Sequence, residues 1–248
     1  MVIILGLLAI GTAHAGQIMS GDELDSFVQG YYLHPKPEHI ADAIKAVGPN
    51  GYVQKNVWGF TAFLGEVFTA HPDRLPEWQK LIARQDKFVR DFLQHSLDLC
   101  QSGGVLAFTG HSAVLNDMYW GAFFASGNPA YVRKLIDQLK YFDERKDKDL
   151  FFAGVTTKWS LLANAERHPL VRKTLEDARA GADARTREII DTMFKQGADD
   201  ARREMHEIFN QQIGWYLEIV FTLSLTIKQV AEATSLARER LVKLKKRD

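Results

Sequence analysis

Apolar residues recur at helical spacing along most of the chain, and prolines and glycines separate the resulting segments. Apolar positions three and four residues apart are typical of helices that bury one face. They predict helices over 20–33, 37–47, 52–70, 76–82, 88–101, 112–126, 129–142, 150–165, 169–175 and 179–197. The one run that would suit a strand, Val105–Phe108, has no partner strand, so we expect an extended link or a helix there. The pattern predicts an all-α fold.

Part of this pattern repeats. Trp120–Ile136 reads WGAFFASGNPAYVRKLI, and Trp159–Leu175 reads WSLLANAERHPLVRKTL, with the two tryptophans 39 residues apart. Each copy has an apolar helix end, a proline at the turn and then Val-Arg-Lys. Gly65–Ile82 is a looser third copy. Self-similarity at this period indicates stacked helical hairpins, here a right-handed α-solenoid similar to tetratricopeptide arrays.

The two ends differ from this array. Val2–Ile10 is a short apolar run, and Ala13-His14-Ala15 fits a signal-peptidase site before Gly16, so we expect an export signal over residues 1–15. An uncleaved anchor or a buried helix is the alternative.

At the other end, Ile213–Thr234 carries heptad-like apolar positions, and the tail from Lys243 to Arg247 is basic. We expect one long helix over 197–248, packed on an array over 16–196 or against a second copy in a homodimer. Glu218 and Lys228 argue against a membrane span in this segment.

The composition argues against a nucleic-acid-binding protein and against a fold stabilised by disulfides. Lys and Arg number 31, as do Asp and Glu, so the chain has no net positive charge to attract nucleic acid. Cys100 is the only cysteine, which excludes an intrachain disulfide, and its leucine-rich surroundings indicate a buried small side chain.

Three stretches carry a resemblance. They are Tyr31–Glu38, the His-Pro turn at Phe68–Pro72 and, above all, Asp117–Gly127. The chain resembles, over about Tyr31–Leu175, a family of uncharacterised exported bacterial proteins. The resemblance implies an all-helical, tetratricopeptide-like fold and no known activity.

Candidate catalytic and metal sites are weak. Gly110-His111-Ser112-Ala113-Val114 is similar to a nucleophile elbow, but Val114 stands where the second glycine is needed, so we expect Ser112 to cap a helix. His34 and His39 are separated by prolines, and His206-Glu207 lacks the second histidine of a zinc-binding helix. We expect no cofactor and no metal. His71 and His168 precede prolines, where the ring is expected to bond a backbone group.

Three carboxylates interrupt apolar helix faces: Glu66, Asp117 and Glu218. We interpret Glu66 and Glu218 as lying on exposed helix edges. Asp117, one turn before Trp120, is the best candidate for a functional polar residue. Trp120 and Trp159 occupy equivalent repeat positions and are interpreted as packing residues between hairpins.

Repeat arrays present extended surfaces, so we expect an exported, periplasmic or secreted module that binds a protein or peptide. Two alternatives stay open. One is an envelope protein that binds the membrane surface through its basic C-terminal helix. The other is a hydrolase with a site near Ser112 and Asp117.

Overall fold

The computed structural model describes residues 19–48, 52–208 and 210, which form helices joined by turns, without a β-strand. The predicted all-α class is therefore confirmed for this part of the chain. The α-helices are α1 (Gly21–Gly30), α2 (Ile40–Ala46), α3 (Tyr52–Ala70), α4 (Leu75–Ala83), α5 (Lys87–Gln101), α6 (Ala113–Ser126), α7 (Pro129–Ile136), α8 (Lys148–Arg167), α9 (Pro169–Gly181) and α10 (Ala184–Lys195). The 3-10 helices are η1 (Tyr31–Leu33), η2 (Pro37–His39), η3 (Val105–Ala107) and η4 (Leu139–Tyr141), and residues 198–208 are also helical.

Local chemistry sets several helix ends. The Ser20 side chain accepts a hydrogen bond from the Glu23 backbone N–H, and the Glu23 carboxylate accepts one from the Ser20 N–H. This reciprocal cap begins α1. Gly127, at φ 64°, ends α6, and Asn128 then caps α7 by accepting from the N–H of Ala130.

Several predicted helices have other ends than expected, and the structure explains two of the changes. Pro37 opens the 3-10 turn η2, so α2 begins only at Ile40. The helix expected over 129–142 ends at Ile136 and continues as η4. A neighbour explains this second change. Gly154 of α8 lies so near that turn that an added Cβ would be 2.5 Å from the Phe142 backbone nitrogen.

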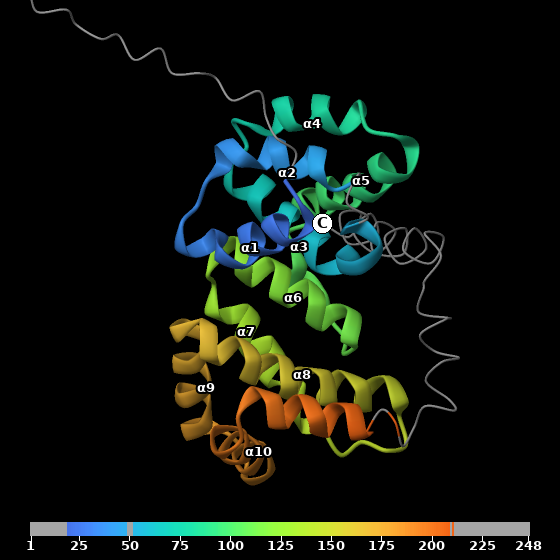
Figure 1. The fold of residues 1–248 in the computed structure, drawn as a ribbon. Coiled ribbons are helices and arrows are strands. Elements are labelled where there is room, and N and C mark those ends of the chain that lie inside the picture. Colours follow the sequence, from blue (N-terminus) through green and yellow to red (C-terminus); the bar gives the residue numbers. More distant parts are fainter. Residues whose placement is uncertain (1–18, 49–51, 209, 211–248) are drawn as a thin grey trace, which may run out of the picture.

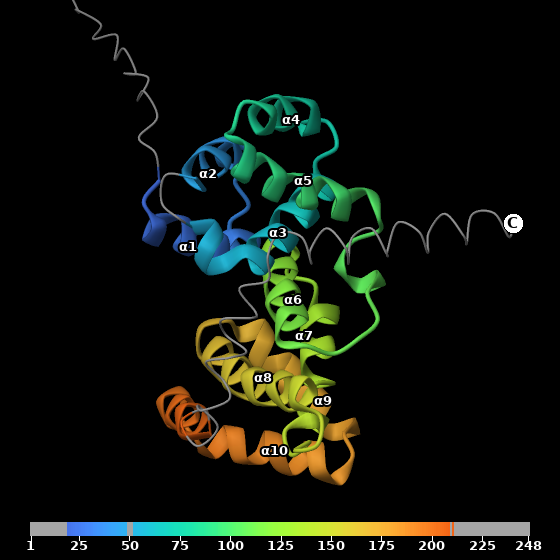
Figure 2. The same cartoon turned by 90° about the vertical axis from the view of Figure 1, so that its right-hand side faces the viewer.

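The helices form an elongated stack. In Figure 1 the chain passes from α4 at the top, through α6 and α7 in the middle, to α8, α9 and α10 at the bottom, and Figure 2 shows the same order from the side. Helix α3 packs against α5 and α6, α6 against α7 and α8, α7 against α9, and α8 against α9. The chain thus places α6 at the centre, in contact with both the upper and the lower helices.

The crossing of α3 and α6 is made by glycines. A Cβ atom added to Gly121 would lie 1.8 Å from the Gly59 carbonyl oxygen, and one added to Gly59 would lie 3.3 Å from the Asp117 carbonyl oxygen. Only hydrogen atoms fit between the two backbones at this point, so the sequence must supply glycine at Gly121.

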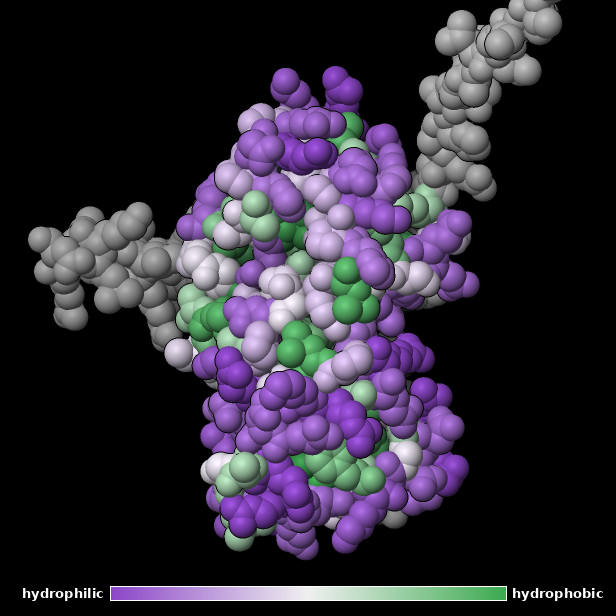
Figure 3. All heavy atoms as spheres, turned by 90° about the vertical axis from the view of Figure 1, so that its left-hand side faces the viewer, coloured by the Kyte–Doolittle hydropathy of each residue, from purple (hydrophilic) through white to green (hydrophobic). Residues whose placement is uncertain are grey.

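One cluster of buried apolar side chains extends from Leu24 to Ala201 and joins all layers of the stack. A small second cluster contains Phe151, Val155 and Met205, where residues 198–208 lie along α8. The surface is mostly hydrophilic on the face drawn in Figure 3, with hydrophobic residues in separate small areas. Among the described helices, none combines the length and apolar character that crossing a membrane requires.

Candidate functional site

Ser112 is a helix cap. Its Oγ accepts a hydrogen bond from the Leu115 backbone N–H at 3.1 Å, which begins α6 as the sequence predicted. The adjacent His111 ring is held elsewhere, since its Nδ1 lies 3.1 Å from Oε1 of the buried Gln138 and its ring lies 4.8 Å from that of Tyr141. The structure therefore gives the Ser112 hydroxyl a structural contact and directs His111 toward η4.

Asp117 is an exposed residue of α6 beside the crossing with α3. Crowding by neighbouring protein atoms raises the pKa of its carboxyl to about 6. Because solvent also reaches the side chain, screening opposes this effect. No hydrogen bond or ion pair to the carboxylate is found within the described ranges. Asp117 thus offers, at the centre of the stack, an acceptor without a partner among the side chains that the structure describes.

Trp120 and Trp159 both contact the next helical layer. The buried Trp120 donates from Nε1 to the Ser160 Oγ of α8 at 3.0 Å. Trp159, partly buried, lies under the guanidinium of Arg202, 6.0 Å from the ring centre. One joins α6 to α8, and the other joins α8 to residues 198–208. Their surroundings favour packing roles, as the sequence analysis anticipated.

Glu66 is the first residue that the sequence analysis placed wrongly. It is half-buried rather than on an exposed helix edge, because α5 and the loop that follows it cover this side of α3. Its Oε1 accepts a hydrogen bond of 2.5 Å from the Tyr131 hydroxyl of α7. Gly104, at φ 76°, fits against the same oxygen, since an added Cβ would lie 2.8 Å from it.

The electrostatics of this pair follow from burial. Desolvation raises the pKa of Glu66, and the hydrogen bond from Tyr131 opposes that shift. Desolvation and the neighbouring carboxylate raise the pKa of Tyr131. Within the described residues, no Lys or Arg pairs with Glu66, so the phenol is the group that stabilises its charge.

His168 is the second residue whose environment differs from the prediction. Its ring does not bond a backbone group at the α8–α9 turn. Instead, Nδ1 lies 3.0 Å from the Tyr32 hydroxyl of η1. The rings of Tyr32, Phe123 and Phe124 lie 5.6, 6.0 and 5.4 Å from the imidazole, which is only 4% exposed. The sequence signal was limited to the aromatic-rich Tyr31–His34 segment and the His-Pro turn.

Metal coordination has no visible basis in the part of the chain that the structure describes, where no three His, Cys, Asp or Glu side chains converge. Cys100 is free and only partly buried, so it is more accessible than we expected. The expected export signal over 1–15, Glu218, the heptad segment Ile213–Thr234 and the basic tail lie outside the described residues.

No protein-family model, curated protein or solved structure matches this chain. The proposals below therefore rest on packing and side-chain geometry.

Proposed function

We propose that the chain is an exported helical-repeat protein that binds a protein or peptide partner, as an interaction module rather than an enzyme. The observation that supports it is the packing of the two repeat copies. Helix α6 packs against α8 and α7 against α9, and the consecutive helices α6 and α7, and α8 and α9, also contact each other. Neighbour-on-neighbour packing of equivalent helices is how solenoids are built.

Polar contacts hold the equivalent helices in register. The amide nitrogen of Asn116, buried in α6, donates to the Ala153 carbonyl oxygen of α8 at 2.9 Å. The bond from Trp120 to Ser160 lies further along the same two helices. Since α3 packs against α6 as well, we propose a right-handed array over residues 16–196.

Asp117 is the residue we propose for partner contact. A carboxylate that is exposed, next to the α3–α6 crossing and without a partner among the described side chains can accept hydrogen bonds from a partner without first breaking such a contact. Leu33, at 48% exposed, is one of two large apolar side chains exposed among the described residues and offers an apolar contact from η1.

The test is a crosslinking pull-down from the native envelope fraction with the chain from Gly16 to Asp248 as bait. A stoichiometric, saturable protein partner supports the proposal, and its affinity is then measured for two variants. We expect Asp117→Asn to weaken binding by about tenfold or more, since a charged hydrogen bond is lost. Asp177→Asn is the matched control, because Asp177 is exposed on α9 and its described partner is Lys173 of the same helix.

Other results count against the proposal. Recovery of lipid in place of protein, with binding lost on deletion of Leu241–Asp248, would establish a membrane-surface protein instead. Absence of both, together with hydrolysis that depends on Ser112 and Asp117, would establish the enzyme alternative. Equal affinities of Asp117→Asn and Asp177→Asn would remove Asp117 from the contact surface.

A further inference from the structure

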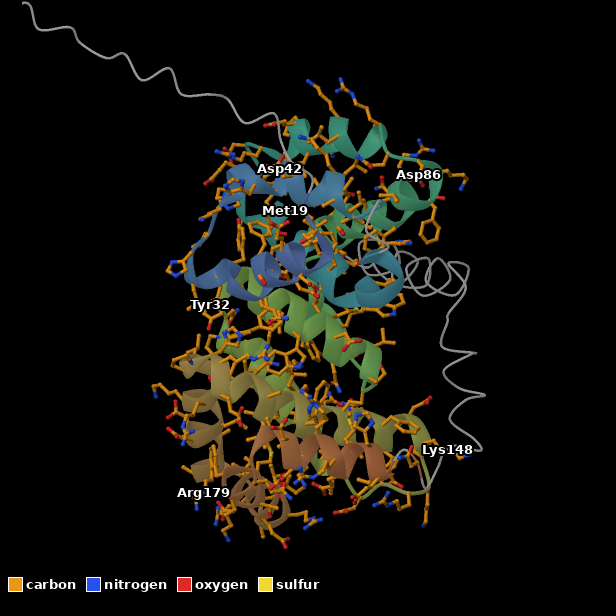
Figure 4. All side chains as sticks on the ribbon, in the orientation of Figure 1. Met19, Tyr32, Asp42, Asp86, Lys148 and Arg179 are labelled. Carbon is orange, nitrogen blue, oxygen red and sulfur yellow. The ribbon has the colours of Figure 1, made fainter. Side chains whose placement is uncertain are left out.

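The contact between Tyr32 and His168 joins parts of the chain that are 136 residues apart. Tyr32 belongs to η1, directly after α1, and His168 to the turn between α8 and α9. Figure 4 places Tyr32 between the N-terminal helices above and α8 and α9 below. We propose that the two side chains form a clasp that is closed while His168 is neutral and opens when His168 is protonated.

The Tyr32 ring fits closely against residues of α6 and the turn that follows it. Tyr32 packs against Gly127 at the end of α6, where an added Cβ would lie 2.7 Å from the tyrosine ring. The Tyr32 ring also lies 4.9 Å from the ring of Phe123. A second, weaker contact joins the same two segments, in which Arg167 donates to the Gln29 side-chain oxygen at 3.4 Å. Three separate turns of the stack therefore meet at the clasp: η1, the α6–α7 turn and the α8–α9 turn.

The position of His168 in the repeat supports a tertiary role. In the first copy Asn128 precedes the turn proline, and its side chain caps α7. In the second copy His168 precedes the proline and makes no side-chain cap to α9. Its ring bonds Tyr32 instead, so this repeat position has exchanged a local cap for a contact between distant segments.

Neutral imidazole fits this site and the charged form does not. In the charged form both ring nitrogens carry a hydrogen, so Nδ1 can no longer accept from the Tyr32 hydroxyl, and that oxygen must become the acceptor. The other ring nitrogen, Nε2, is buried and has no hydrogen-bond partner among the described residues. The neutral ring can carry its single hydrogen on either nitrogen, whereas the charged ring must bury both an unpartnered Nε2–H and a positive charge, so protonation favours a state in which water reaches the ring.

The charged groups around the ring act in the same direction. Burial lowers the pKa of His168, and the positive charge of Arg167 on the same turn lowers it further. The other side chains that contact the ring are Tyr32 from η1 and Phe123 and Phe124 from α6, while the uncharged Gln29 of α1 bonds Arg167. No described carboxylate offsets Arg167. Burial also raises the pKa of Tyr32, which keeps its hydroxyl protonated and able to donate at neutral pH.

The sign of the pH dependence follows. Because the pKa of His168 is lower in the closed state than the ordinary value of 6.5, the closed state is fully favoured above pH 6.5. As the pH falls below 6.5, the open state takes up a proton first. The ratio of open to closed clasp then rises about tenfold for each pH unit, until the closed state is protonated as well.

Amide hydrogen exchange of the full chain tests whether protonation of His168 opens the clasp. We expect exchange, corrected for its intrinsic pH dependence, to accelerate together in residues 29–34 and 164–171 between pH 7.5 and pH 5.5. His168→Asn should remove this acceleration, because asparagine does not titrate. Tyr32→Phe keeps the ring but not the hydroxyl, and should accelerate exchange in 164–171 already at pH 7.5.

His34→Asn is the matched control, since His34 is exposed two residues from Tyr32 and should respond as the native chain does. His95 of α5 also has a pKa lowered by burial, so only the two clasp segments are diagnostic. The proposal is overturned by an acceleration that persists in His168→Asn, or by unchanged exchange in Tyr32→Phe. If either variant does not fold, an NMR titration of His168 in the native chain decides, and a pKa at or above 6.5 contradicts the clasp.

Discussion

At the scale of single residues, we expect the Glu66–Tyr131 pair to change stability with pH in the opposite direction to His168. Burial raises the pKa of Glu66 above its ordinary value of 4.5. A carboxyl whose folded pKa is raised contributes its full stability below the unfolded pKa and loses it as the pH rises through the folded pKa. Ionised Glu66 therefore costs stability at neutral pH, and the bond from Tyr131 limits that cost.

Two substitutions separate the effect of the Glu66 charge on stability from the effect of its hydrogen bond with Tyr131. Glu66→Gln keeps an acceptor for Tyr131 and removes the charge, so we expect its stability relative to the native chain to rise as the pH increases from 4.5 to 8. Tyr131→Phe leaves the carboxylate without a partner and should destabilise the protein by about 1–3 kcal/mol at pH 8. Urea unfolding at both pH values measures each effect.

Glu77→Gln, on the exposed side of α4, is the control and should show no such pH trend. A Glu66→Gln curve parallel to the native one at every pH would mean that Glu66 is well solvated.

Local side-chain chemistry was predictable from sequence at this scale, and distant pairing was not. The caps at Ser20 and Ser112 involve partners three residues away, so the sequence alone indicates them. Glu66 and Tyr131 are 65 residues apart, and their contact depends on how α3 and α7 pack. His168 depends on the fold in the same way. A single sequence carries no signal that pairs such residues.

Among the elements, the crossing of α3 and α6 leaves the least room for an added side chain. Gly121→Ala would place a Cβ 1.8 Å from the Gly59 carbonyl oxygen, so the two helices must separate. Such overpacking costs about 1–3 kcal/mol, and we expect the upper end because the obstacle is backbone. Chemical denaturation of the variant measures the loss.

Gly30→Ala is the matched control for this substitution. It has open space around its Cβ position and an ordinary helical φ of −91°. It should be neutral or stabilise the protein by about 0.4–1 kcal/mol. Equal stabilities of the two variants would show that α3 and α6 slide apart without cost.

Helix positions were well predicted because turn residues mark them, and helix lengths less so. Pro129, Pro169 and Gly127 lie at the helix ends where the sequence indicated them. The shortened α7 was not foreseen, since its end is set by the close approach of Gly154 on α8. The role of Gly121 was also missed, because a glycine within an apolar helix gives no indication of which backbone it faces.

For the whole molecule, the sequence predicted the helical class from periodicity, while the stacking order needed the structure. The layers share one apolar cluster, from Leu24 to Ala201, whose members are far apart in the sequence and meet in the folded chain. Residues 198–208 are held differently. They contribute Ala201 to the large cluster, while Met205 belongs to the small cluster with Phe151 and Val155, and Lys158 of α8, 5% exposed, bonds Glu204 at 2.6 Å.

This difference predicts that residues 198–208 open before the rest of the stack. Glu204→Gln leaves the ammonium group of Lys158 without a counter-charge in an almost closed site. Breaking a fully buried pair costs about 3–5 kcal/mol, and since the Glu204 side chain is 32% exposed we expect about 2 kcal/mol. Hydrogen exchange in 198–208 should then accelerate about 30-fold, while α3 and α6 keep their protection because the large cluster is unchanged.

Arg203→Ala on the same helix is the control. The Arg203–Asp200 pair is exposed on both sides, so its loss should change exchange by less than about threefold. Equal acceleration in α3 and in 198–208 would show that the stack opens as a single unit. In that case the contact between Lys158 and Glu204 would stabilise the whole array and not its last helix alone.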